Sequence, residues 1–199
     1  MRQGVKLIVF SACVVLIATA VGAIMAFYSN KGGELSNVLI TKGSSVHLQE
    51  LFNPEDYWLP GETKQKELNF GNEGERDQVL RFRMELQWQD MDGEIWIPKT
   101  ENPVQINRVS AFEEEWESFP EDNGWYYYKK VLPAGSETAK VMDSVTFSEN
   151  LSNDNQGEDF TNTTYRIMIY MEAVNVDSVI TAEKWGKTFT GNTSLEWKN

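Results

Sequence analysis

Alternation of apolar and polar residues over nine consecutive positions, Leu80 to Trp88, is the feature that most limits the folds open to this chain. From Val79 to Trp88, apolar residues occupy every second position, and most residues between them are charged or polar. Side chains alternate between the two faces of a strand, so this pattern predicts a half-buried β-strand with one face in water. The expected core-facing residues are Leu80, Phe82, Met84, Leu86 and Trp88.

A second alternating stretch runs from Tyr165 to Ala173. Its expected core face comprises Tyr165, Ile167, Ile169 and Met171. Shorter candidate strands are separated by turn signals of Gly, Pro and Asn; they are residues 46–52, 64–70, 104–109, 125–132 and 140–147. Short strands at this spacing predict an all-β fold, an antiparallel β-sandwich or jelly-roll-like domain.

Two segments depart from the strand pattern. Residues 110–118 hold three consecutive glutamates between aromatics at helical spacing, which predicts a helical turn on a connection. Residues 175–185 predict a short C-terminal helix that Asn175 caps and Gly186 ends. The tail at 187–199 is weakly patterned; it either stays loose or docks through its apolar residues, which are Phe189, Leu195 and Trp197.

The N-terminus carries an uncharged apolar run from Leu7 to Phe27 behind a short basic tip. A run of about 20 residues can also span a bilayer, so a retained membrane anchor stays open. The basic tip and the small Ala26 favour a signal peptide over residues 1–26, cleaved to leave Phe27 as the first mature residue. We therefore expect a secreted, extracellular or cell-surface protein that meets the membrane only through the uncleaved segment.

Acidic residues dominate the mature chain. Cleavage after Ala26 removes two of 18 basic residues and none of 30 acidic ones, which shifts the net charge from −12 to −14. Such a surface repels nucleic acid, so no nucleic-acid partner is expected. Cleavage also removes Cys13, the only cysteine, so the mature protein cannot form disulfides.

The segment Asp90-Met91-Asp92-Gly93-Glu94 supplies weak calcium candidates in Asp90, Asp92 and Glu94, since calcium prefers several oxygen ligands. It lacks the full spacing of a calcium loop, and the same residue types suit a tight turn, which is the favoured interpretation.

No combination of residues typical of an enzyme is present. His47 is the only histidine, so a catalytic zinc site with two or three imidazoles cannot be built. The sequence also lacks a GxSxG nucleophile turn and a glycine-rich phosphate loop. We expect no catalytic residues, and no cofactor beyond the possible calcium.

Four consecutive aromatic residues, Trp125 to Tyr128, must face both sides of a strand. Either a helix near Trp185 covers the outward pair, or that pair forms an assembly surface.

Several motifs occur in an order similar to that of one bacterial family. They are Ala26-Phe27-Tyr28-Ser29-Asn30, Gly43-Ser44-Ser45-Val46-His47-Leu48, Trp58-Leu59-Pro60-Gly61-Glu62, Asn69-Phe70-Gly71-Asn72-Glu73-Gly74 and Ala182-Glu183-Lys184-Trp185-Gly186. Over residues 1–186 the chain resembles the TasA/camelysin-like superfamily, with most similarity to the BsaA-type SipW-dependent biofilm matrix proteins of Gram-positive bacteria. It departs from that pattern at Arg81-Phe82, where the family has an aromatic–Val pair, and in the tail after Gly186.

The resemblance implies processing by a SipW-type signal peptidase and a sandwich over residues 43–186 that polymerises into extracellular biofilm matrix fibres. Family members donate an N-terminal segment to the next subunit. The corresponding segment here is 27–42, in which Leu35, Val38, Leu39 and Ile40 are the donor-strand candidates. Polar residues 29–33 precede them and suit a flexible hinge. Two alternatives stay open: a camelysin-like surface metallopeptidase, and a monomeric adhesion or binding module at the cell surface.

Overall fold

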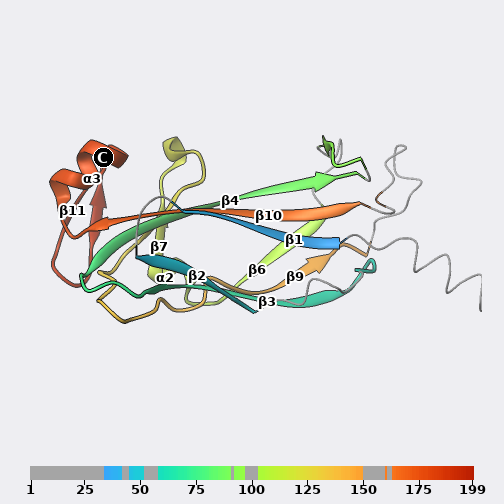
Figure 1. Ribbon diagram of the computed structural model, residues 1–199, viewed down its shortest axis with the longest axis horizontal. Helices are drawn as coiled ribbons and strands as arrows, with labels where there is room; N and C mark the ends of the chain where they lie inside the picture. Colours follow the sequence, from blue (N-terminus) through green and yellow to red (C-terminus); the bar gives the residue numbers. More distant parts are fainter. Residues whose placement is uncertain are drawn as a thin grey trace, which may run out of the picture.

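The structure is a computed structural model that describes residues 34–41, 45–51, 58–90, 92–96, 103–149, 160 and 163–199. For residues 34–41, 51 and 96 it describes the backbone alone. Two β-sheets lie one above the other along the length of the molecule (Figure 1). The predicted all-β sandwich is therefore confirmed.

The larger sheet runs in the order β1-β10-β4-β8-β7, and β5 also pairs with β4. Its strands are β1 (Glu34–Thr41), β10 (Thr164–Asn175), β4 (Gln78–Gln89), β8 (Tyr126–Tyr128), β7 (Trp116–Ser118) and β5 (Ile95–Trp96). β10 and β4 pair antiparallel from Thr164↔Gln89 to Asn175↔Gln78, so the two strands with the clearest alternation form the centre of this sheet.

The smaller sheet has the order β2-β3-β9-β6. Its strands are β2 (Val46–Leu51), β3 (Thr63–Asn72), β9 (Met142–Phe147) and β6 (Val104–Arg108). Two short helices lie on the connection before β8, α2 (Phe112–Glu115) and the 3-10 helix η1 (Pro120–Asp122). The helical turn expected at 110–118 is thus shorter than predicted, because Trp116–Ser118 leaves it to pair with β8 as strand β7.

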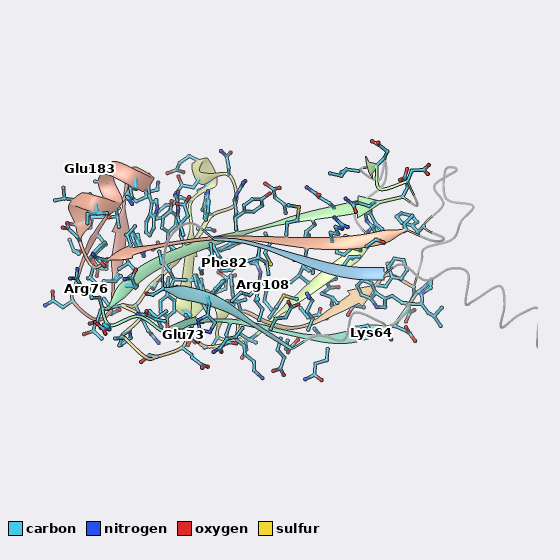
Figure 2. All side chains as sticks on the ribbon, viewed as in Figure 1. Lys64, Glu73, Arg76, Phe82, Arg108 and Glu183 are labelled. Carbon is cyan, nitrogen blue, oxygen red and sulfur yellow. The ribbon has the colours of Figure 1, made fainter. Side chains whose placement is uncertain are left out.

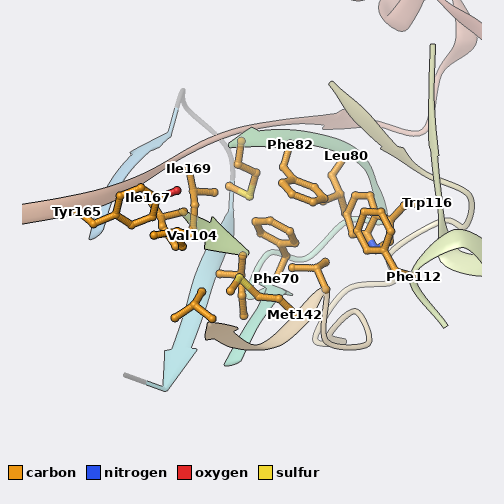
Figure 3. Close-up of a cluster of buried hydrophobic side chains, with 14 of the residues drawn as sticks. Phe70, Leu80, Phe82, Val104, Phe112, Trp116, Met142, Tyr165, Ile167 and Ile169 are labelled. Carbon is orange, nitrogen blue, oxygen red and sulfur yellow. The ribbon is translucent and has the colours of Figure 1, made fainter. Parts of the chain in front are cut away.

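The main core lies between the two sheets, where the facing residues of β4, β10, β3 and β9 meet. Phe82 lies near its middle (Figure 2), and its ring packs 4.7 Å from that of Trp116 and 5.1 Å from that of Phe70. In the close-up of Figure 3, Phe82, Phe112 and Trp116 lie on one side and Ile167 and Ile169 lie near Tyr165 on the other. The core face predicted for β10 is confirmed, since its four named residues are buried.

Leu86 is the exception on β4, where Leu80, Phe82 and Trp88 are buried and Met84 is partly buried. Leu86 stays 38% exposed, so its predicted burial is wrong. β8 pairs with β4 only at Arg81 and Phe82, and β5 only at Trp88 and Gln89. Between these contacts no described strand flanks this side of β4, so the sandwich is open beside Leu86.

A second, smaller core covers the outer face of the larger sheet at one end. It is built from α3 (Ser178–Trp185) and the hairpin of β11 (Thr188–Thr190) and β12 (Glu196–Lys198), which lie together in Figure 1. Leu195 and Trp197 are buried, so the docking alternative for the tail is confirmed. Trp185 packs 6.2 Å from the ring of Tyr127, so the helix covers part of the aromatic run.

The caps of α3 agree with the sequence at one end only. Gly186 ends the helix in the left-handed conformation at φ 69°, as predicted. The N-cap is Asp177, whose carboxylate accepts a hydrogen bond from the Val179 N–H at 2.8 Å. The cap predicted at Asn175 is wrong, because Asn175 still belongs to β10 and pairs with Gln78.

Arg81 joins this second core to the sheet. Its guanidinium lies 4.1 Å from the Trp125 ring and 4.9 Å from the Trp185 ring, and donates to Glu172 and to the Tyr127 hydroxyl. Burial raises the pKa of Tyr127 to about 12, while the Arg81 contact acts in the opposite direction.

In the variant Tyr127→Phe, the free energy of unfolding is expected to fall less steeply between pH 10 and 12 than in the wild type. The unfolded tyrosine ionises near its ordinary pKa of 10 and the folded one near 12, so between these values the folded state binds more protons. The stabilisation that results from this pKa difference is complete below pH 10. It is lost as the pH rises through 12, by at most about 1.4 kcal/mol per pH unit. Urea unfolding between pH 10 and 12 measures the slope, and equal slopes for Tyr127→Phe and wild type would contradict the assignment.

Candidate assembly surface

Among the described strands, β1 lies at an outer edge of the larger sheet and pairs only with β10. The two strands run parallel, from Glu34↔Thr164 to Thr41↔Met171. Every other pairing between described strands is antiparallel. The segment predicted as a donor strand is thus a strand in the single chain, and it is held by one neighbour.

The register assigns the four donor candidates to two faces of the sheet. Positions 35 and 39 pair with Tyr165 and Ile169, which are buried in the core. Positions 38 and 40 pair with Met168 and Tyr170, which lie on the outer face between the buried residues of β10. Because neighbouring positions on paired strands share a face, β1 offers apolar residues to both sides. Sequence reasoning identified the strand, and pairing in space determined its two faces.

The rest of the sheet does not depend on β1 for its pairing. β10 is paired with β4 over its whole length on the side away from β1. Removing β1 therefore breaks one ladder and exposes the backbone N–H and C=O groups along one edge of β10. An exposed edge of this kind accepts an added strand.

The connection from β1 to β2 is short, and its far end is fixed. The Ser45 hydroxyl donates to Asn72 Oδ1 at 3.0 Å, and the Glu73 N–H donates to the Ser45 carbonyl at 3.1 Å. Asn72 Oδ1 also accepts from the Gly74 N–H at 3.0 Å. A Cβ at position 74 would lie 2.2 Å from Ser45 Oγ, so glycine permits this close approach. Ser45, the first described residue after β1, is therefore fixed to the turn between β3 and β4.

The flexible hinge expected at residues 29–33 stays a prediction. Those residues precede β1 and lie outside the described ranges. A strand can pass to another molecule only if the chain bends between that strand and the body of its own molecule. Sequence reasoning found the Asn72-Glu73-Gly74 turn signal but could not show that Ser45 is its partner across the sheet.

The calcium candidates form a turn. Asp90 Oδ1 accepts the Asp92 N–H at 3.0 Å and the Glu94 N–H at 2.8 Å, and Gly93 has a φ of 83°. One carboxylate oxygen is therefore occupied by the turn itself, in agreement with the favoured interpretation. Over the described residues no group of three or more His, Cys, Asp or Glu side chains is arranged to hold a metal ion.

His47 lies on β2 with its ring partly exposed. Its Nε2 is 3.7 Å from Glu73 Oε1 and 3.4 Å from Gln49 Nε2. A Cβ at position 71 would lie 2.7 Å from His47 Cε1, so the imidazole lies in space that only glycine leaves free. One carboxylate near a single imidazole does not make a zinc site with an open position for water.

Ala26 and Phe27, the expected cleavage site, lie outside the described residues, as does the whole of segment 1–26. None of the helices that the structure describes is long and apolar enough to cross a membrane.

Comparisons with known proteins add little. No family model matches the sequence, and no curated protein is significantly similar to it. Among solved structures, the ASH / PapD-like domain of human CEP192 (PapD-like domain 7) is 12% identical, with 75% of this chain and 89% of that chain covered. Its TM-score of 0.26 is too low to support a shared fold or function. The β-sandwich assignment rests on the strand pairing of this chain itself.

Proposed function

We propose that this chain is a secreted, non-enzymatic subunit of extracellular biofilm matrix fibres, released by a SipW-type signal peptidase and polymerised by donation of its N-terminal strand. The observation that supports this most is the position of β1, which is paired on one side only and joined to the body by residues 42–45. The resemblance to SipW-dependent matrix proteins supplies the cellular setting.

Strand donation follows from the balance between two ways of pairing the edge of β10. In one molecule β1 closes a short loop, which costs little entropy. Between molecules the same pairing costs the translational and rotational freedom of a whole subunit. The single-chain form therefore dominates at low concentration. A high protein concentration, or strain in the self-paired form, favours the exchanged form.

Donation from one molecule to the next produces a filament. The donor strand and the accepting edge of β10 are different surfaces, so the contact is head-to-tail. The molecule that accepts a strand still has its own β1 to donate to another molecule, so growth continues at both ends.

The mature N-terminus is expected to be Phe27, because Ala26 is the small residue at the end of the apolar run. Intact-mass measurement of secreted protein tests this directly. A secreted or surface-bound species that retains residues 1–26 would instead indicate a membrane-anchored protein.

Electron microscopy of protein that begins at Phe27 is the test of fibre formation. We expect filaments whose number rises with protein concentration, and none from a matched chain that begins at Gly43. Sedimentation of the Phe27 form as a single monomer at all concentrations would instead favour a monomeric adhesion module. Stoichiometric zinc together with casein cleavage would favour the metallopeptidase.

A further inference from the structure

Lys187 is the buried cation of the C-terminal hairpin. It lies between α3 and β11, and it is 3% exposed although lysine side chains usually reach water. Its ammonium lies 4.3 Å from the centre of the Phe119 ring. By contrast, Lys184 and Lys198 on the adjoining elements are exposed.

Three groups converge on the Lys187 nitrogen. Nζ donates to Glu121 Oε1 at 3.2 Å, and Asp122 Oδ2 lies at the same distance. Nζ also donates to the side-chain carbonyl oxygen of Asn199, at the end of the hairpin. Asp122 Oδ2 is buried and has no partner in good hydrogen-bond geometry. The Lys187 amine thus meets two carboxylates and a carboxamide beside an aromatic ring.

Glu121 touches both reacting groups. It accepts hydrogen bonds from Lys187 and from Asn199, and hydrogen bonds from its own backbone and from Lys187 hold the pKa of its carboxyl below the ordinary value. Glu121 is therefore an ionised carboxylate, and in that form it orients the carboxamide of Asn199. η1 fixes its position, since this 3-10 turn starts at Pro120 and ends at Asn123 in the left-handed conformation.

We propose that Lys187 and Asn199 form a spontaneous amide cross-link, with Asp122 carrying the proton. The ammonium of Lys187 passes a proton to Asp122, which leaves a neutral amine. Nζ attacks Asn199 Cγ and forms a new C–N bond, while the bond from Cγ to Nδ2 breaks. Asp122 passes its proton to the departing nitrogen, the second Nζ proton also moves there, and one ammonium ion leaves, so Asp122 ends as a carboxylate. No oxidant or other reactant is needed.

Two physical terms favour the reaction. Burial of an ammonium costs free energy, and the cross-link replaces it with a neutral amide. The hydrogen bond between Nζ and the carboxamide also holds the two groups together, which removes most of the entropic cost of a bimolecular encounter. The product would tie the chain before β11 to the chain after β12, across twelve residues, and would close the hairpin covalently.

Tryptic mapping of the full 199-residue protein tests the proposal. Trypsin does not cut after an acylated lysine, so we expect a peptide that spans residues 185–198, uncut at Lys187 and carrying Asn199 on its side chain. The intact protein should be lighter than its sequence by one ammonia. Cleavage after Lys187, with Asn199 unmodified and no loss of ammonia, would overturn the proposal and leave an ordinary ion-pair cluster.

Two variants distinguish a covalent cross-link from an ordinary ion-pair cluster. Lys187→Arg keeps the charge but supplies no amine nucleophile, so the linked peptide should vanish, whereas the control Lys184→Arg should retain it. Asp122→Asn should slow formation of the linked peptide by about 100-fold or more, since a proton carrier is lost. Linkage at the wild-type rate in Asp122→Asn would refute the role of Asp122. If Lys187→Arg fails to fold, the map of the wild-type protein alone decides.

Discussion

Phe82→Ala is expected to lower the free energy of unfolding by about 3–5 kcal/mol, because the residue is fully buried and a large cavity would remain. The ring packs against Phe70 and Trp116 in the main core, and 5.5 Å from the ring of Tyr126. Residues from both sheets lose a packing partner at once, so the site cannot collapse to fill the space. Urea unfolding monitored by tryptophan fluorescence measures the change.

Leu86→Ala is the matched control on the same strand. Its side chain is 38% exposed at the open side of the sandwich, so the loss should stay below about 1 kcal/mol. A small loss for Phe82→Ala, or equal losses for both variants, would show that the core is assigned to the wrong place.

Leu39→Asp combined with Ile40→Asp is expected to abolish fibre formation while leaving the sandwich folded. By register, position 39 lies on the core side and position 40 on the outer side of the larger sheet, so the charges disturb both faces of a docked strand. A carboxylate carried into an apolar environment costs several kcal/mol unless it is paired. The same penalty applies in the donor's own sheet and in a neighbour's, so the strand is left undocked.

Ser29→Asp combined with Asn30→Asp is the control, because it adds the same charge outside β1. Electron microscopy should show filaments for this control and none for the β1 variant, and circular dichroism should show a folded sheet for both. Filaments from the β1 variant would exclude strand donation through this segment. An unfolded β1 variant would make β1 an integral first strand.

Local patterns were sufficient to predict the two central strands. β4 and β10 are long, pair with each other along their whole length and largely alternate, so the face of most residues follows from their position. Leu86 was misassigned because its burial depends on a neighbouring strand, and the sequence does not show where β8 and β5 stop pairing with β4. Alternation predicts a face of a strand but not whether another element covers it.

The burial of charged side chains also could not be predicted from the sequence. Lys66 is buried on the same face of β3 as Leu68 and Phe70, and it is paired with Glu50 of β2. Burial lowers the pKa of Lys66, and the Glu50 contact opposes that shift. Lys187 is similar, since its partners come from η1 and from the end of the chain. Each such residue depends on a contact between segments that no local pattern connects.

The parallel pairing of β1 could not be predicted either. The sequence indicated that residues 35–40 are apolar enough to pair, and left open whether they fold back or hang free. The structure has them folded back on β10, in a register that gives each position a defined partner. That register makes the central proposal directly measurable.

Disulfide trapping between two molecules tests strand donation most directly. Val38 and Met168 are register partners, and neighbouring strands place such residues within disulfide range. Chains that begin at Phe27 lack Cys13, so Val38→Cys and Met168→Cys each supply the only thiol of their molecule. Mixed at fibre-forming concentration and oxidised, the two proteins should give a dimer whose linked peptides join positions 38 and 168. Absence of that link between molecules, together with efficient closure within a chain that carries both cysteines, would show that β1 stays in its own sheet.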